Sequence, residues 1–128
     1  MCPTIGVHFY ELDWRRLLKR CEQLCHYRNG SVPVGQGKAC FDSDEATKVL
    51  IFSNAVFSVD SLHCSHTIEV AKLDYDTNHE MWELYINSAE DASLAEPVWL
   101  PHPVHFAHAN PMILLSVIEK DAEECIWR

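Results

Sequence analysis

Two groups of histidines are the residues of this chain whose types and spacing best suit chemistry. Five of the eight histidines fall within residues 63–66 and 102–108, and the first of these segments also holds a cysteine. Histidine nitrogen and cysteine thiolate are the usual ligands of zinc, and three histidines with one open position suit metal-activated water. One hypothesis is therefore a small hydrolase that uses zinc or another divalent metal. Its candidate ligands are His102, His105 and His108, or His63, Cys64 and His66.

The spacing of the second group counts against a shared metal ion. Near Pro101 and Pro103 the chain favours an extended conformation that rises roughly 3.1 Å per residue, which separates successive histidines by about 9 Å. Metal–nitrogen bonds are only about 2 Å long. A short helix beginning at Pro103 would instead bring His105 and His108 together at i, i+3 spacing. We favour loop or core histidines with ordinary hydrogen bonds, and we expect no cofactor.

No other motif identifies a reaction. The G-x-S-x-G sequence of a nucleophile elbow does not occur. Residues 35–38 end in Gly-Lys, as a phosphate-binding loop does. However, Val32 and Ala39 stand where such a loop needs glycine and Ser or Thr. A simple turn is the better interpretation of this segment.

The distribution of charge gives the leading functional hypothesis. The formal net charge is −9, yet residues 13–28 hold five of the ten basic side chains. The 98 residues after Gly30 carry 5 basic and 16 acidic side chains, a net charge of −11. A surface of this sign argues against direct nucleic-acid binding, which needs basic residues against phosphate. It suits a protein that binds a basic partner by electrostatic complementarity.

We therefore expect a non-enzymatic inhibitor or immunity-type protein that neutralises a basic protein, such as a nuclease toxin or a nucleic-acid-binding defence complex. Trp99, in a proline-rich segment, is a candidate aromatic anchor for such an interface. A homodimer through the basic helix or the final strand is a further possibility. The candidate binding residues are Asp74, Asp76, Glu80, Glu83, Glu90, Asp91, Glu96 and Trp99.

Length, hydropathy and cysteines indicate one domain, residues 1–128, in the cytoplasm. No apolar run approaches the ~20 residues that cross a bilayer, and the N-terminus does not resemble a secretory signal. Without such a signal, the six cysteines are expected to be free and buried, as is usual in a reducing compartment. No membrane association is expected.

The clearest structural signal is an amphipathic helix over residues 13–28. Apolar residues recur there at i, i+3, i+4 and i+7, with Asp13 as a candidate N-cap and Asn29-Gly30 as a candidate left-handed stop. Before it, Thr4–Tyr10 alternates as a short strand does, and residues 29–38 are expected to form a loop. The apolar stripe consists of Trp14, Leu17, Leu18, Cys21, Leu24 and Cys25.

The best β signal is a hairpin over Thr67–Asn87, with a polar turn at residues 76–79 and one negatively charged face. A helix over residues 77–92 is the alternative, because apolar residues there also fit a period of 3.6. Residues 41–59 are ambiguous between helix and strand. We favour a turn or short helix near residues 43–47, followed by a strand rich in β-branched and aromatic residues.

The C-terminal part, residues 88–127, carries conflicting signals. Residues 88–111 are rich in proline and are expected to be a loop, and 112–118 form a buried element. Asn110-Pro111 is a possible helix start, but the acidic residues from Glu119 onward would crowd the negative end of that helix. We favour a terminal hairpin over residues 111–127. The fold class is therefore α+β, a single small domain with an antiparallel sheet of four to six strands packed against the N-terminal helix.

Overall fold

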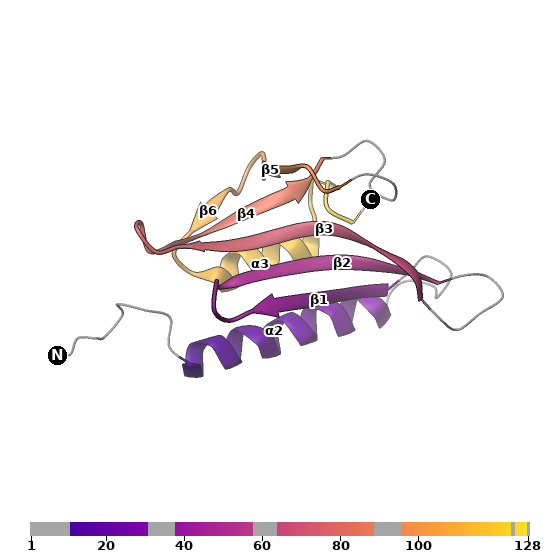
Figure 1. Ribbon diagram of the computed structural model, residues 1–128, viewed down its shortest axis with the longest axis horizontal. Helices are drawn as coiled ribbons and strands as arrows, with labels where there is room; N and C mark the ends of the chain where they lie inside the picture. Colours follow the sequence, from indigo (N-terminus) through magenta and orange to yellow (C-terminus); the bar gives the residue numbers. More distant parts are fainter. Residues whose placement is uncertain (1–10, 31–37, 58–63, 89–95, 124, 128) are drawn as a thin grey trace.

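The protein is an α+β domain; in the part of the chain that the structure describes, a six-stranded antiparallel sheet packs against two helices (Figure 1). The computed structural model describes residues 11–30, 38–57, 64–88, 96–123 and 125–127. The strands follow one another in the order β1-β2-β3-β4-β5, and β6 also pairs with β4. In chain order the elements are α2 (Glu11–Gly30), β1 (Lys38–Asp44), β2 (Val49–Phe57), β3 (Cys64–Asp76), β4 (Met81–Asn87), β5 (Trp99–Pro101), β6 (Ala107–His108) and α3 (Pro111–Lys120).

The predicted N-terminal helix is confirmed as α2. Its apolar stripe is buried against the sheet, because residues at i, i+3, i+4 and i+7 share one helix face. The predicted ends are wrong: the helix already includes Glu11, so Asp13 is not its N-cap, and it continues through Gly30. The Asn29 side chain instead reaches β1, where its amide nitrogen donates to the Ala39 carbonyl and its oxygen accepts from the Ala39 N–H. The predicted strand at 4–10 lies outside the described residues.

The predicted hairpin over residues 67–87 is confirmed as β3 and β4, with its turn at residues 77–80. The strand predicted for the second half of 41–59 is also present, as β2. However, no strand is predicted where β1 lies: its first residue falls in the predicted loop over 29–38, and its last two fall in the turn or short helix predicted near 43–47. The two hairpin turns share their chemistry: Asp44 and Asp76 each accept two backbone N–H groups from the turn. Each turn then ends on a residue with positive φ, Lys48 or Glu80.

The predicted terminal hairpin is wrong, because residues 111–120 form the helix α3. Asn110 caps its start by accepting from the Met112 N–H at 3.0 Å, and Pro111 occupies the first turn. The helix ends before most of the acidic residues, on Asp121 in the left-handed conformation at φ 44°. Glu119, in the last turn, forms a bidentate pair with Arg20 of α2 at 3.1 and 3.3 Å. With no terminal strand, only the helix option for a homodimer stays a prediction.

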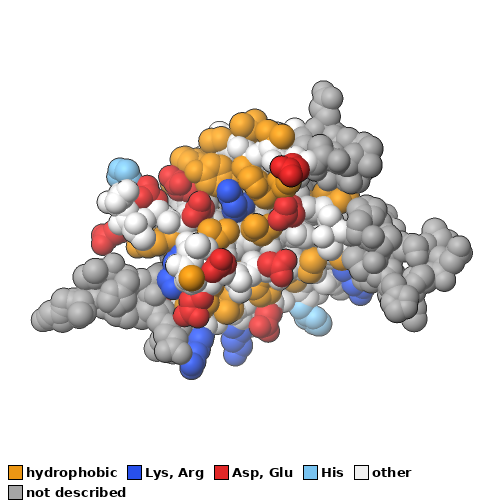
Figure 2. Space-filling model, in the orientation of Figure 1, with side chains coloured by type: hydrophobic (Ala, Val, Ile, Leu, Met, Phe, Trp, Pro, Cys, Tyr) orange, Lys and Arg blue, Asp and Glu red, His pale blue; other side chains and the backbone are white. Residues whose placement is uncertain are grey.

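One face of the sheet is buried, and the other is not covered by α2 or α3, the two helices among the described residues. The buried face meets α2 and α3 in a core that includes Leu50, Phe52, Leu73, Trp82 and Leu84. Figure 1 shows α3 behind the strands, so the view is onto the uncovered face, which Figure 2 draws in the same orientation. We call this uncovered face the outer sheet face. By strand alternation and register it carries Asp42, Asp44, Val49, Ile51, Lys72, Asp74, Asp76, Glu83, Tyr85 and Trp99.

Among the described helices, neither is long and apolar enough to cross a bilayer. The four cysteines whose side chains the structure describes are free, as expected: Cys21 and Cys25 are buried and Cys40 and Cys125 are half-buried.

Candidate binding face

The predicted acidic residues gather around one hairpin. Asp74 of β3 lies directly opposite Glu83 of β4, and Asp76 ends β3 on the same face. Glu80 is exposed in the following turn, and Glu96 is exposed in the segment before β5. Glu90 and Asp91 lie outside the described residues. Three of the predicted side chains therefore share the outer sheet face, and a fourth lies at its end.

Two further acidic side chains, which the sequence did not predict as binding residues, extend this surface. Asp44 pairs with Val49 across β1 and β2, and Val49 pairs in turn with Asp74. Asp42 lies two residues earlier and is likewise exposed. The alternating pattern of β1 is the signal in the sequence that places them, but it is visible only once residues 38–44 are known to form a strand. Figure 2 shows acidic side chains spread over this face, interrupted by hydrophobic ones.

The acidic side chains differ in how strongly they are held. The Asp76 carboxylate contacts the His79 ring at 2.6 Å; this bond lowers the pKa of Asp76 and raises the pKa of His79. Glu83 accepts a hydrogen bond from the Tyr85 hydroxyl at 3.0 Å. Burial, together with that bond and the nearby carboxylates, raises the pKa of Tyr85 to about 12, so its hydroxyl remains a donor. Asp74 and Glu83 are like charges directly opposite one another, an arrangement that destabilises a sheet.

Trp99, the predicted aromatic anchor, lies on the edge strand β5, where it pairs with Asn87. Its ring is half-buried and lies over the Lys72 ammonium group, 5.2 Å from the ring centroid. Its neighbours Val98 and Leu100 are 49% and 51% exposed, which is high for large apolar side chains. The structure thus places an aromatic and aliphatic edge beside the acidic hairpin.

The histidine group at 102–108 is held by hydrogen bonds that leave little room for a metal ion. His102 is buried, and its Nδ1 accepts from the backbone N–H groups of Val104 and His105 at 3.1 and 3.0 Å. The proton of the neutral ring must therefore lie on Nε2, so neither ring nitrogen has a free lone pair for a metal ion. In a ligating histidine, one nitrogen binds the metal and the other usually donates a hydrogen bond, whereas Nδ1 of His102 accepts. Burial is the main cause that lowers the pKa of His102, which keeps this ring neutral.

His108 shows the same pattern, because its Nδ1 accepts from the Asn110 N–H at 2.8 Å. The ring of His105 is 5.8 Å from that of His102, centroid to centroid. Within the described part of the chain, no group of three or more His, Cys, Asp and Glu side chains is arranged to hold a metal. The geometry thus disfavours the metal-dependent alternative at 102–108. The side chains of His63, Cys64 and His66 lie outside the described residues.

A nucleophilic role for Cys125 meets the same obstacle. Its sulfur lies 3.7 Å from the Nε2 of His102, and the Glu123 carboxylate lies 3.6 Å from the same nitrogen. A thiol needs a base with a free lone pair, and Nε2 carries the proton instead. The contacts are those of a buried histidine that fastens the 102–105 turn to the C-terminal segment.

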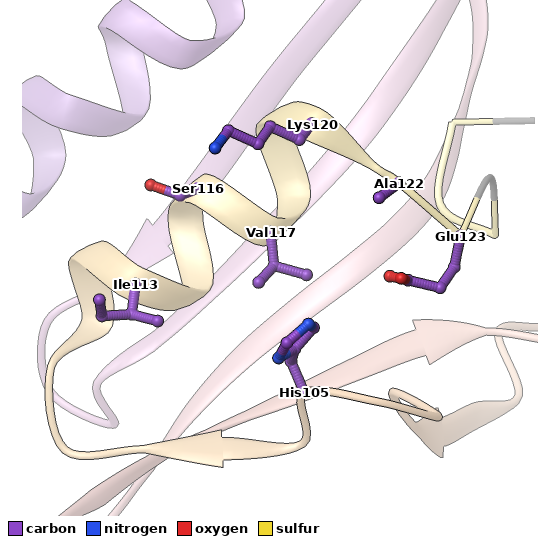
Figure 3. A pocket seen from close by; sticks show the side chains of 7 residues that line it. All are labelled: His105, Ile113, Ser116, Val117, Lys120, Ala122 and Glu123. Carbon is purple, nitrogen blue, oxygen red and sulfur yellow. The ribbon is translucent and has the colours of Figure 1, made fainter.

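A pocket of about 250 Å³ opens beside His105, between α3 and the segment that precedes β6 (Figure 3). The His105 ring and the Glu123 carboxylate point into it, and Lys120 points away along α3. The volume is below the roughly 300–1,000 Å³ usual for ligand sites. The Ser116 hydroxyl in its lining donates to the Met112 carbonyl of its own helix at 3.1 Å. We therefore regard the outer sheet face as the better candidate site.

Comparison with known proteins adds one finding. No curated protein and no solved structure matches this chain. A family model with the description "Domain of unknown function (DUF3024)" matches residues 9–128, which is nearly the whole chain, and the protein therefore belongs to this family.

Proposed function

We propose that the protein is a non-enzymatic binding protein of the inhibitor or immunity type, which holds a basic protein partner against the outer sheet face. The observation that carries the proposal is that carboxylates from β1, β3 and β4 project from a face that neither helix covers. Tyr85 and Trp99 add half-buried aromatic surface beside them. Aromatic anchors within a polar surround are typical of interface hot spots.

The partner class follows from charge. Proteins that hold nucleic acid expose basic residues for phosphate, and an acidic face competes for that surface. A nuclease toxin or a nucleic-acid-binding defence complex fits this description. Complementary charge would also speed association and make it sensitive to salt. The exposed basic residues of α2, among them Arg16 and Lys19, belong to the helix beside β1, at the end of the sheet away from β4 and β5 (Figure 1).

A cytoplasmic location is part of the proposal. It is supported by the free state of Cys21, Cys25, Cys40 and Cys125, since thiols persist in a reducing compartment.

The test begins with affinity purification from the source cell and mass spectrometry of what is retained. Binding of the recovered partner is then measured at 50 and 300 mM salt for the wild type, Asp74→Lys and a matched control. Glu22→Lys makes the same charge change on an exposed position of α2, which is not part of the sheet. We expect Asp74→Lys to weaken binding at least tenfold, about 1.4 kcal/mol, and Glu22→Lys to weaken it far less.

Two results would count against the proposal. Salt-insensitive binding would remove the electrostatic basis. Equal losses for Asp74→Lys and Glu22→Lys would show that the partner responds to net charge and does not dock on the sheet.

A further inference from the structure

A lysine already lies in the acidic and aromatic part of the outer sheet face. Lys72, on β3, is half-buried, and its Nζ lies 5.1 Å from the centroid of the Tyr85 ring and 5.2 Å from that of Trp99. Register explains this arrangement, because Lys72 lies directly opposite Tyr85 of β4, and the next strand, β5, carries Trp99. A cation within about 6 Å of a ring centroid is attracted by the ring's quadrupole, and here two rings act on one ammonium group.

The Tyr85 ring is held by groups other than the lysine. Its hydroxyl donates to Glu83, and its edge meets the Phe106 ring at 5.4 Å in a T-shaped contact. Trp99 is fixed through its backbone, which is paired with Asn87 on β4. The Tyr85 ring therefore keeps its supports when the lysine leaves, and Trp99 keeps its backbone position beside it. The lysine itself has a flexible four-carbon stem and can swing toward Asp74, two residues along the same face.

We propose that Tyr85 and Trp99 form a clamp for a cationic side chain of the protein partner, and that Lys72 occupies this clamp in the free protein and is displaced on binding. The inference rests on the proposed function and names the group that the outer sheet face recognises. Arginine is the best competitor, because its planar, weakly hydrated guanidinium stacks on aromatic rings. The Glu83 carboxylate beside the clamp has further lone pairs to accept from such a group.

The first experiment uses hexa-arginine as the probe and compares Lys72→Met with Lys38→Met. Both variants remove one positive charge and keep an unbranched stem, and Lys38 begins β1, far along the same sheet from the rings. We expect Lys72→Met to bind hexa-arginine at least fivefold more tightly than Lys38→Met does at the same salt concentration. Adding Trp99→Leu to Lys72→Met should abolish that gain. Equal affinities for Lys72→Met and Lys38→Met would overturn the clamp.

The second experiment needs no variant, which guards against a substitution that fails to fold. In the wild type, the ε-methylene protons of Lys72 should resonate upfield because they lie over two rings. Saturation with hexa-arginine should return them to an ordinary lysine shift. An ε-methylene signal that stays upfield at saturation would show that the lysine is not displaced, and would overturn the inference.

The outcomes separate the two proposals. If Asp74→Lys abolishes binding of the cellular partner while Lys72→Met and Lys38→Met behave alike, the face binds its partner and the clamp is wrong. If Asp74→Lys and Glu22→Lys have equal effects on the partner, the proposed function fails, whatever the result with hexa-arginine.

Discussion

His102 provides the sharpest prediction about stability, because one imidazole nitrogen accepts from two backbone N–H groups inside the protein. We compare His102→Leu with His102→Asn. Leucine fills the site with apolar atoms but offers no acceptor. Asparagine is smaller, yet its side-chain oxygen can take the place of Nδ1 and accept from the same N–H groups.

The expected magnitudes follow from the two hydrogen bonds. A buried donor left without a partner costs about 1–3 kcal/mol. The bonds to Val104 and His105 are only part-buried, so the lower part of that range applies to each, and His102→Leu should lower the free energy of unfolding by roughly 2–4 kcal/mol. His102→Asn keeps the acceptor and loses mainly packing around the missing ring atoms, which amounts to about 1–2 kcal/mol. Leucine should therefore be the worse substitution, although it is the more apolar one. Burial alone predicts the opposite order.

The pH dependence gives a second measurement on the same residue. Burial lowers the pKa of His102 below its ordinary value of 6.5, against the opposing effect of Glu123. As the pH falls below about 6.5, the unfolded chain gains a proton at this histidine and the folded chain does not. The unfolded state is thereby favoured, and the wild type loses stability that His102→Asn cannot lose. The stability advantage of the wild type over His102→Asn should therefore shrink between pH 7.5 and pH 5.5.

Urea unfolding of the three proteins at both pH values is the assay. The reasoning is refuted if His102→Leu is at least as stable as His102→Asn at pH 7.5. A difference between wild type and His102→Asn that does not change with pH would refute the account of the lowered pKa.

Three further predictions concern the contacts that hold the ends of the domain. Asp121→Ala should lower the free energy of unfolding by about 3 kcal/mol, because the carboxylate accepts backbone N–H groups from three residues of the C-terminal segment; urea unfolding measures the loss, and a loss below 1 kcal/mol would contradict it. Asn29→Ala removes both side-chain bonds to Ala39, so hydrogen exchange at the Ala39 amide should quicken at least tenfold, and unchanged exchange would speak against this edge contact. Burial raises the pKa of Cys21 and of Cys25 to about 12, so iodoacetamide at pH 8 should modify them, by mass spectrometry, only after unfolding; rapid modification of the native protein would disprove this protection.

The parts of the fold that the sequence predicts are those set by local pattern. The stripe that includes Trp14, Leu17 and Leu24 has the helical period, and its burial in α2 follows directly. The hairpin of β3 and β4 combines alternation with a polar turn, which fixes both its position and its faces. Such elements need no information from distant parts of the chain.

The elements that were missed depend on contacts far apart in sequence. Acidic residues near Glu119 argued against α3, but Arg20, 99 residues away, pairs with Glu119 in the folded protein. Asp121 is similarly satisfied by backbone N–H groups that follow it. The strand β1 is hard to predict for another reason. Its second half is polar and exposed, so it lacks a buried apolar face. Its first half is held by a hydrogen bond from the Ala39 N–H to the Asn29 side chain of α2.

The candidate site divides in the same way. Alternation along one hairpin was enough to place Asp74, Asp76 and Glu83 on a common face. Alternation could not predict that Lys72 lies near two rings. One of these rings, Trp99, is on β5, which is only three residues long, and so short a strand carries no pattern that specifies its pairing with β4.

The pairing of Asp74 with Glu83 also bears on why this face looks as it does. Two carboxylates directly opposite one another cost stability, and the nearest cation on the face, Lys72, directs its ammonium toward aromatic rings. A sheet selected for stability alone would place a lysine or threonine opposite Asp74. A local conflict of this kind is expected where a surface serves binding, because an incoming cation removes the repulsion only in the complex. Glu83→Thr should therefore stabilise the free protein and weaken its binding to the basic partner. Stability should rise and affinity should fall, because the substitution removes a repulsion from the free protein and a carboxylate that the partner's cation would bind in the complex.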